Sequence, residues 1–189
     1  MEDQVLVREF LSGDRDAFDR IYEKYSTELF RTACLLCRSR ADAEDAVQET
    51  FVAFYLKAAQ IKKPGSLRWW LIRCLTAKAR DAMRRAKREV PEEEAEALAE
   101  ADGFRKGRGP DFAPGLLERE AFAEDLMSLP PKYREVLVLY YFNGLTVKEI
   151  AALTGKLEGT VKSRLYHARE QLRRRMEGGE GAWTAWTTR

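Results

Sequence analysis

Residues 146–176 read TVKEIAALTGKLEGTVKSRLYHAREQLRRRM, and this stretch decides the fold of the C-terminal part of the chain. Thr146 and Glu149 form a capping-box pattern, which predicts that a short helix begins there. The tripeptide at 154–156 predicts a tight turn, because its central glycine readily adopts the conformation that ends a helix. A longer helix is expected to follow, to about residue 177. Two helices joined by a short turn of this kind are typical of a helix-turn-helix.

The second of these helices has one apolar side and one polar side. Its apolar residues recur at intervals of three or four and predict one buried stripe: Val161, Leu165, Ala168, Leu172 and Met176. In a helix-turn-helix the second helix enters the major groove of DNA. The polar side therefore offers candidates for base edges, Lys162, Ser163, Tyr166 and His167, and for phosphates, Arg164, Arg169, Arg173 and Arg174. The alternative is an ordinary solvated amphipathic helix.

The charge of the chain is arranged in blocks. The 33 Lys and Arg residues almost balance the 31 Asp and Glu residues, so the total of +2 predicts no partner. Residues 61–88, however, hold ten basic residues and one acidic residue, whereas residues 89–102 hold seven acidic residues and no basic one. Glycines and prolines follow the acidic run, so residues 89–116 are predicted to be a linker. The chain is thus expected to have two small helical domains and a tail: 1–88, 117–177 and 178–189.

Helical periodicity extends over most of the remaining sequence. Periodic apolar residues, caps and breaks predict five further helices: about 14–38, 39–60, 66–88, 116–127 and 131–143. No segment alternates apolar and polar residues for long enough to form a strand. The predicted fold class is therefore all-α.

The helix expected over 39–60 combines acidic and apolar residues. Its core stripe is predicted to be Val47, Phe51, Phe54, Tyr55 and Ala58. At about 100° per residue, another narrow sector holds Asp42, Asp45 and Glu49 together with Val52 and Leu56. Apolar side chains exposed among carboxylates favour docking to a basic, partly apolar protein. The alternative is that these acids only solvate and cap the helix.

The helix expected over 66–88 carries a basic cluster beside two tryptophans. The cluster consists of Arg68, Arg73, Lys78, Arg80, Arg84, Arg85, Lys87 and Arg88. Aromatic rings stack on unpaired bases while cations follow the backbone, so this combination favours single-stranded nucleic acid. Adjacent helical residues point about 100° apart, so we expect at least one of Trp69 and Trp70 to be buried.

Several classes of protein lack the residues that they need. No apolar run approaches the ~20 residues that span a bilayer, and the N-terminus does not resemble a secretory signal, so we expect a cytoplasmic protein without membrane insertion. No nucleophile with an adjacent base and no phosphate-binding glycine loop occurs, so we expect neither catalytic residues nor a cofactor. The odd number of cysteines favours reduced thiols. A metal or redox centre built from Cys34, Cys37, Cys74 and His167 remains a remote alternative.

Three segments together resemble a known family. They are DAEDAVQETFVAFYLKA, WWLIRCLTAKARDAMRRAKR and LPPKYREVLVLYYFNGLTVKEIAALTGKLEGTVKSRLYHAREQLRRRM, and they occur in the order found in bacterial group IV sigma factors, the extracytoplasmic-function type. The resemblance covers most of residues 5–177. It implies two helical domains, sigma regions 2 and 4, that bind core RNA polymerase and direct it to promoters.

The resemblance also implies roles for individual residues. The helix that binds the polymerase clamp is matched by Asp42, Asp45, Gln48, Glu49 and Val52, to which the acidic-apolar sector adds Leu56. Contacts to the melted −10 element are matched by Lys57, Lys62, Lys63, Ser66, Arg73, Lys78, Arg80, Arg84 and Arg85. The −35 recognition helix is matched by Gly159, Thr160, Lys162, Ser163, Arg164, Tyr166, His167 and Arg169, and its polar side adds Arg173.

The partners implied are the beta and beta-prime subunits of core RNA polymerase, promoter DNA and an anti-sigma factor. The acidic linker is similar to the family segment that passes near the polymerase active centre. The main alternative is a stand-alone helix-turn-helix regulator whose upstream domain is a sensor. Duplex binding without polymerase would favour that alternative.

Overall fold

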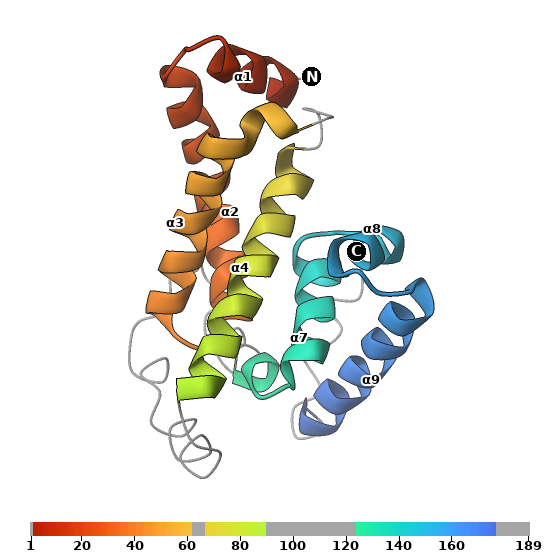
Figure 1. Cartoon of the computed structure of the whole chain (residues 1–189). Coiled ribbons are helices and arrows are strands. Elements are labelled where there is room, and N and C mark those ends of the chain that lie inside the picture. The colour runs from red at the N-terminus through yellow and green to blue at the C-terminus, as the bar shows by residue number, and fades with distance from the viewer. Residues whose placement is uncertain (1, 62–66, 90–123, 177–189) are drawn as a thin grey trace. The chain divides into compact units, whose positions relative to one another are not determined.

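The computed structural model describes residues 2–61, 67–89 and 124–176, and the chain forms two compact units, Met1–Gly107 and Arg108–Arg189. The described residues of both units form helices and no strand, which confirms the all-α fold class (Figure 1). Several expectations lie outside the described residues: the −10 residues Lys62, Lys63 and Ser66, nearly all of the linker, the first part of the helix at 116–127, and the tail.

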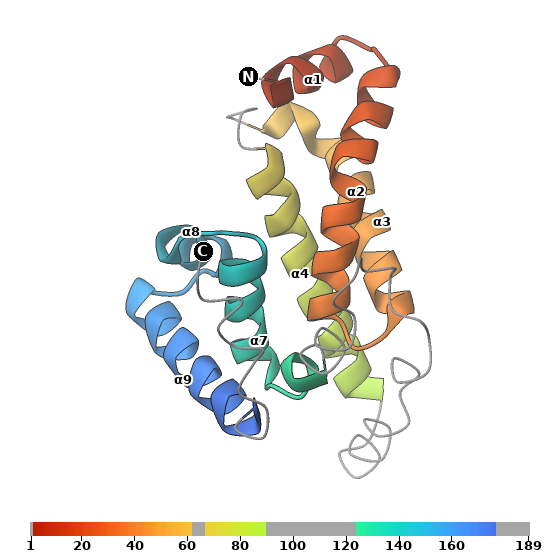
Figure 2. The same cartoon turned by 180° about the vertical axis from the view of Figure 1, so that it is seen from behind.

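Unit 1, Met1–Gly107, is a bundle of three long helices with a short helix at one end. The helices are α1 (Glu2–Leu11), α2 (Asp16–Leu36), α3 (Arg40–Lys57), a 3-10 turn (Ala58–Gln60) and α4 (Leu67–Glu89). Both views show α2, α3 and α4 side by side along their lengths, with α1 across one end (Figures 1 and 2). The three long helices were expected within a few residues of these bounds, whereas α1 was not expected from the sequence.

The core of unit 1 lies between the three long helices. Its largest fully buried apolar side chains come from each of them: Ile21, Leu29, Leu36, Phe54, Leu67, Leu71, Ile72 and Leu75. Burying one such side chain stabilises the fold by about 1.5–3 kcal/mol, which makes this the dominant favourable contribution. Ser39 is the N-cap of α3, because its Oγ accepts a hydrogen bond from the backbone N–H of Asp42 at 3.1 Å.

One predicted core residue of α3 is wrong. Val47, Phe51, Phe54 and Ala58 are buried, but Tyr55 is 57% exposed. Tyr55 lies at the edge of the stripe, where its ring contacts Phe10 and Phe18 with centroids 5.4 and 5.8 Å away. Because Phe10 belongs to α1, the sequence pattern of α3 alone could not show what would cover this edge.

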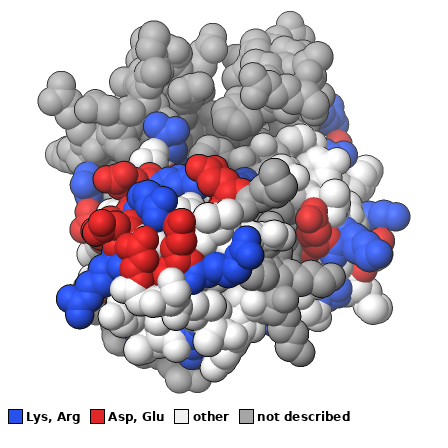
Figure 3. Space-filling model, turned by 90° about the horizontal axis from the view of Figure 1, so that it is seen from above, with Lys and Arg blue, Asp and Glu red and all other residues white. Residues whose placement is uncertain are grey.

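Polar contacts hold α1 against α2. The Lys24 ammonium donates to Glu2 at 2.6 Å and Asp3 at 2.8 Å, and the Tyr25 hydroxyl donates to Asp3 at 2.6 Å. Burial and this hydrogen bond to Asp3 both raise the pKa of Tyr25, so the phenol remains protonated. Figure 3 views the end of the unit that carries α1, where acidic and basic side chains lie next to one another.

Unit 2, Arg108–Arg189, contains the helix-turn-helix. Its described part consists of a helical turn at 124–127, α7 (Pro131–Leu137), a π-helix (Val138–Phe142), α8 (Val147–Thr154) and α9 (Glu158–Met176). The start at Pro131 and the end at residues 143–144 are confirmed. The widening of this helix into a π-helix was not expected.

The predicted cap and turn of the helix-turn-helix are confirmed. The N–H of Glu149 donates to Thr146 Oγ1 at 3.2 Å, and the N–H of Thr146 donates to Glu149 Oε2 at 2.8 Å. Gly155 ends α8 with φ +66°, in the left-handed region. The stripe of Val161, Leu165, Ala168 and Leu172 on α9 is buried, and the side chain of Met176 lies outside the described residues.

Replacing Gly155 tests whether the turn depends on left-handed backbone. Nothing lies within 4 Å of a Cβ added at Gly155, so Gly155→Ala costs about 1 kcal/mol through backbone strain and not through a clash. Native-state hydrogen exchange of the α8 and α9 amides should become about fivefold faster. Gly159→Ala is the matched control, because Gly159 also has open space but lies in α9 without a positive φ. Equal exchange in wild type and Gly155→Ala would show that the turn does not limit local stability.

Candidate nucleic-acid and protein-binding surfaces

The polar side of α9 faces solvent. Of the nine residues predicted for −35 recognition, six are exposed: Gly159, Lys162, Ser163, Tyr166, His167 and Arg173. Thr160, Arg164 and Arg169 are half-buried. Tyr166 is 62% exposed, so its ring and hydroxyl are both open to a partner. We call these nine residues the α9 surface.

Neighbouring groups orient the charged and aromatic members of the α9 surface. The His167 ring lies 5.4 Å from Tyr166 and 6.2 Å from Tyr133 of α7, centroid to centroid. Arg173 forms an ion pair with Glu170 at 3.3 Å, and its hydrogen bond lowers the pKa of that carboxyl group. The Arg169 guanidinium lies instead against the rings of Tyr140 and Tyr141. Cations on this surface are therefore held in two different ways.

The exposed sector of α3 combines acids with apolar side chains, as the sequence predicts. Asp45, Gln48, Val52 and Leu56 are exposed, and Asp42 and Glu49 are half-buried. Val52 is 51% exposed and Leu56 is 72% exposed. We call these six residues the α3 surface. Asp42 also serves the N-cap of its helix, because the Ser39 hydroxyl donates to Asp42 Oδ2 at 2.8 Å.

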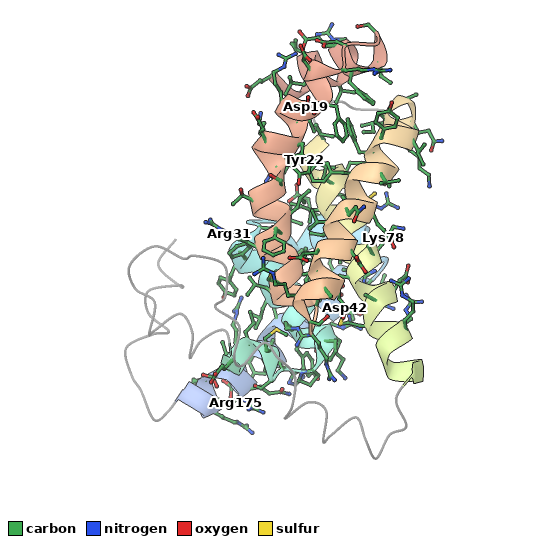
Figure 4. All side chains as sticks on the ribbon, turned by 90° about the vertical axis from the view of Figure 1, so that its left-hand side faces the viewer. Asp19, Tyr22, Arg31, Asp42, Lys78 and Arg175 are labelled. Carbon is green, nitrogen blue, oxygen red and sulfur yellow. The ribbon has the colours of Figure 1, made fainter. Side chains whose placement is uncertain are left out.

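Two tyrosines near the α3 surface were missed from the sequence. The sequence pattern predicts Tyr55 in the core and does not single out Tyr22 of α2. Tyr22 is 47% exposed, and its ring lies 4.7 Å from the Phe51 ring across the α2–α3 boundary. Figure 4 shows Tyr22 on α2 beside α3, with Asp42 at the start of α3. The edge position of each tyrosine on its helix was the only sequence signal.

The basic side of α4 is partly occupied by contacts within the unit. Arg73, Arg84 and Arg85 are exposed, as is Lys57 at the end of α3, whereas Lys78 and Arg80 are half-buried. These six are the described members of the predicted −10 set. The Arg73 guanidinium lies 5.4 Å from the Trp69 ring centroid, which places a cation and an aromatic ring together at the surface.

The expectation that one tryptophan is buried is wrong, because Trp69 and Trp70 are both only half-buried. The Trp70 ring packs edge to face with the ring of the buried Phe54, with centroids 6.2 Å apart. The Arg73 guanidinium lies over the Trp69 ring. Both lie in the first turn of α4, at an end of the bundle where few side chains can cover an indole. Such large rings are rarely buried completely.

An ion pair joins the α3 surface to the basic side of α4. Lys78 Nζ lies 2.6 Å from Glu49 Oε2 (Figure 4 shows Lys78 on α4 near α3). The hydrogen bond from Lys78, with a smaller contribution from the charge of Arg85, lowers the pKa of Glu49. A residue predicted to bind polymerase and one predicted to bind DNA therefore neutralise each other in this structure.

The cysteines do not form a reactive or metal-binding centre in the described part of the chain. Cys34 and Cys37 are buried and Cys74 is half-buried, while His167 belongs to the other unit. Burial raises the pKa of the Cys34 thiol to about 11, which keeps it protonated at neutral pH. Across residues 2–61, 67–89 and 124–176, no three His, Cys, Asp or Glu side chains come together as metal ligands. The metal or redox alternative thus gains no support.

Within the described part of the chain, no helix is both long enough and apolar enough to cross a membrane.

The two units match two parts of one protein family. Residues 21–89 match the family model of sigma-70 region 2, and residues 119–172 match that of sigma-70 region 4. The ECF RNA polymerase sigma factor SigM of Mycobacterium tuberculosis is 30% identical over 174 residues, which cover 91% of this chain and 83% of SigM. The chain belongs to the ECF sigma factors. SigW of Bacillus subtilis is 28% identical to this sigma factor, over 90% of this chain and 94% of SigW.

Solved structures show the same fold. CnrH, solved in complex with the cytosolic domain of CnrY, is 26% identical to this sigma factor, with a TM-score of 0.66 over 94% of this chain and 99% of CnrH. The sigma factor RpoE of Bartonella quintana, solved with the anti-sigma factor NepR, is 24% identical, with a TM-score of 0.68 over 86% of this chain and 98% of RpoE. The residues of this chain that match region 2 include α3 and α4, and those that match region 4 include α8 and α9.

The ion pair predicts how Glu49 titrates. In the folded sigma factor the pKa of Glu49 lies below its usual value, and in Lys78→Met it returns toward that value. The pair therefore stabilises the fold above the unfolded pKa of Glu49 and loses this effect as the pH falls through the folded pKa. Side-chain carboxyl chemical shifts measured by NMR during an acid titration check this. Arg84→Met is the control, because Arg84 pairs with Asp81 and should leave Glu49 unchanged. A Glu49 pKa that is identical in all three proteins would contradict the ion pair.

Proposed function

We propose that this sigma factor binds core RNA polymerase through the α3 surface and reads promoter DNA through the α9 surface and the basic side of α4. Residues 1–88 would serve as the region 2 domain and residues 117–177 as the region 4 domain, with 89–116 as linker. The observation that carries the proposal is α9 itself, a helix with a fully buried stripe and an opposite side rich in cations and hydrogen-bond donors.

The α9 surface suits the −35 duplex. Lys162 lies in the N-terminal half of the helix, the half that contacts base edges in helix-turn-helix proteins. A lysine matches the O6 and N7 acceptors of guanine, and a serine such as Ser163 can donate or accept. Arg164, Arg169 and Arg173 supply charge for phosphates on either side. In this proposal one helix carries both the residues that read bases and the residues that bind the phosphate backbone of DNA.

The basic side of α4 suits an unpaired −10 strand. Trp69 offers a half-buried aromatic ring, and the Arg73 cation lies over it. Bases stack on such rings, and each stacked base contributes about 1–3 kcal/mol to binding. Lys62, Lys63 and Ser66 remain predicted contacts, since they lie outside the described residues.

The α3 surface suits a basic protein partner with an apolar centre. Val52 and Leu56 expose apolar area that costs solvation free energy until a partner covers it. The carboxylates around them select for positive charge and accelerate association. We assign this surface to the core polymerase, with its beta and beta-prime subunits as the proposed contacts.

A regulatory protein partner is also proposed. CnrH is similar over nearly the whole chain and was solved bound to another protein, the cytosolic domain of CnrY. This likeness supports an anti-sigma factor as a further partner. A protein with these partners acts in the cytoplasm and performs no catalysis of its own, since RNA synthesis belongs to the polymerase.

Transcription in vitro tests the function as a whole. Purified protein added to core RNA polymerase should produce discrete transcripts from genomic fragments, and mapping their starts should reveal one shared promoter sequence. Core polymerase alone is the control and should give no such transcripts. If no fragment is transcribed specifically, yet the protein binds a specific duplex tightly by itself, the stand-alone helix-turn-helix regulator is the correct function.

Charge placed on the α3 surface should weaken polymerase binding. Val52→Lys combined with Leu56→Lys removes two apolar contacts and sets positive charge against a basic partner, so it should raise the Kd for core polymerase by at least tenfold, a loss of about 1.4 kcal/mol or more. Both side chains are exposed, so the fold should remain intact. Val5→Lys combined with Leu11→Lys is the matched control, because it makes the same two changes at exposed apolar residues of α1. Unchanged affinity in the double variant would exclude the α3 surface as the polymerase contact.

A further inference from the structure

Arg169 shares one edge of α9 with three exposed residues. Lys162, Tyr166, Arg169 and Arg173 follow one another at helical intervals of four, three and four residues, so they form one row along the helix. Lys162, Tyr166 and Arg173 are exposed, whereas Arg169 is half-buried. Arg169 is therefore the member of the row that the rest of unit 2 constrains most.

Two tyrosine rings hold the guanidinium of Arg169. Its Cζ lies 5.6 Å from the ring centroid of Tyr141 and 5.9 Å from that of Tyr140. The two rings meet edge to face, with centroids 4.9 Å apart and planes at 79°. Both distances lie within the range of an attractive cation–π contact. Among the described residues no carboxylate pairs with Arg169, and its buried Nε donates no hydrogen bond.

The π-helix provides this arrangement. The N–H of Asn143 donates to the carbonyl of Val138 at 3.0 Å, which closes the wider i to i+5 turn. Tyr140 and Tyr141 are consecutive residues of this segment, and both are half-buried. A π-turn inside an α-helix is uncommon, and such turns recur at functional sites. Here its result is that two neighbouring rings contact one cation.

The contrast with Arg173 shows what the rings achieve. Arg173 is held by the carboxylate of Glu170, so it must exchange one anion for another before it contacts a phosphate. The tyrosine faces attract the Arg169 cation without accepting its N–H groups in conventional hydrogen bonds. Arginine loses about 2 kcal/mol of side-chain entropy when it is ordered, and at Arg169 part of this cost is already met in the free protein.

We propose that Tyr140 and Tyr141 are positioning residues that hold the Arg169 guanidinium ready for a phosphate oxygen of the −35 duplex. The proposal rests on the proposed function of the α9 surface and adds the two tyrosines to it. They touch no DNA themselves and act only through Arg169. The ligand is the phosphate backbone, so the contact strengthens binding to all sequences and does not select a base.

The test uses holoenzyme assembled from core polymerase and the full-length protein, with a promoter duplex identified by transcript start mapping. The slope of log K against log salt concentration reports the number of phosphates contacted. Arg169→Ala should reduce the magnitude of this slope by about 0.9, the value for one phosphate on B-DNA. The pair Tyr140→Leu with Tyr141→Leu should produce most of the same reduction. Tyr140→Phe with Tyr141→Phe should retain the wild-type slope, because phenylalanine keeps the aromatic face.

Combining the variants separates positioning from general stability. Arg169→Ala together with the leucine pair should be no worse than Arg169→Ala alone, since both changes remove the same contact. Hydrogen exchange of α7–α9 identifies any variant that unfolds. If the leucine pair unfolds unit 2, the single Tyr141→Leu variant decides the question. Additive losses, or an unchanged slope in Arg169→Ala, would overturn the proposal.

Lys162→Ala distinguishes failure of this inference from failure of the proposed function. If Lys162→Ala weakens promoter binding while Arg169→Ala leaves both affinity and slope unchanged, the tyrosine pair has no positioning role, but α9 still binds DNA. If neither variant changes binding, the α9 surface does not contact the promoter, and both proposals are wrong.

Discussion

The apolar stripe of α9 packs against α7 and α8 with almost no exposed surface, and this burial decides what unit 2 presents to solvent. A fully buried leucine contributes about 1.5–3 kcal/mol, whereas solvent screens an exposed ion pair such as Glu170–Arg173, so that pair contributes little. If α9 were rotated so that its cations faced the core, the lost apolar burial would therefore cost far more free energy than any surface ion pair could recover. With one side fixed in the core, the 3.6-residue period places Lys162, Ser163 and Tyr166 outside.

The same competition explains the α3 surface. Val47, Phe51 and Phe54 occupy the interior, so the opposite sector cannot be buried within unit 1 whatever its composition. Val52 and Leu56 consequently remain exposed, at a cost in solvation that a binding partner can recover. The Glu49–Lys78 pair beside them is exposed enough to be weak, so a partner can replace either member with little loss of free energy. The fold thus leaves Val52 and Leu56 accessible to a partner, and it leaves Glu49 and Lys78 able to exchange their ion pair for contacts with that partner.

Tyrosines have a recurrent role next to charged groups in both units. Tyr25 donates to Asp3 and fastens α1, whereas Tyr133 lies beside His167, and Tyr140 and Tyr141 hold Arg169. A phenol ring buries apolar area and still offers either a hydroxyl donor or a π face to an ion. On α9 the ring contacts therefore order the Arg169 guanidinium, whereas a carboxylate orders Arg173.

The sequence by itself determined the elements that depend on short-range rules. The helix-turn-helix, its capping box and its glycine turn follow from residues within one or two helical turns of each other, as do α2–α4 and the all-α class. The exposure of Val52 and Leu56 was also predictable, because helical periodicity assigns each residue to a side. The contents of the two recognition helices could thus be identified before any tertiary contact was known.

Tertiary structure alone decided which edges of those helices are covered. The ring that Tyr55 contacts, Phe10, belongs to the unexpected α1, and the half-burial of both tryptophans depends on where the bundle ends. The Glu49–Lys78 pair and the tyrosine contacts of Arg169 join residues from different helices, at separations that no periodic pattern encodes. Periodicity fixes the direction of a side chain from its own helix axis, but only packing determines which neighbour it meets.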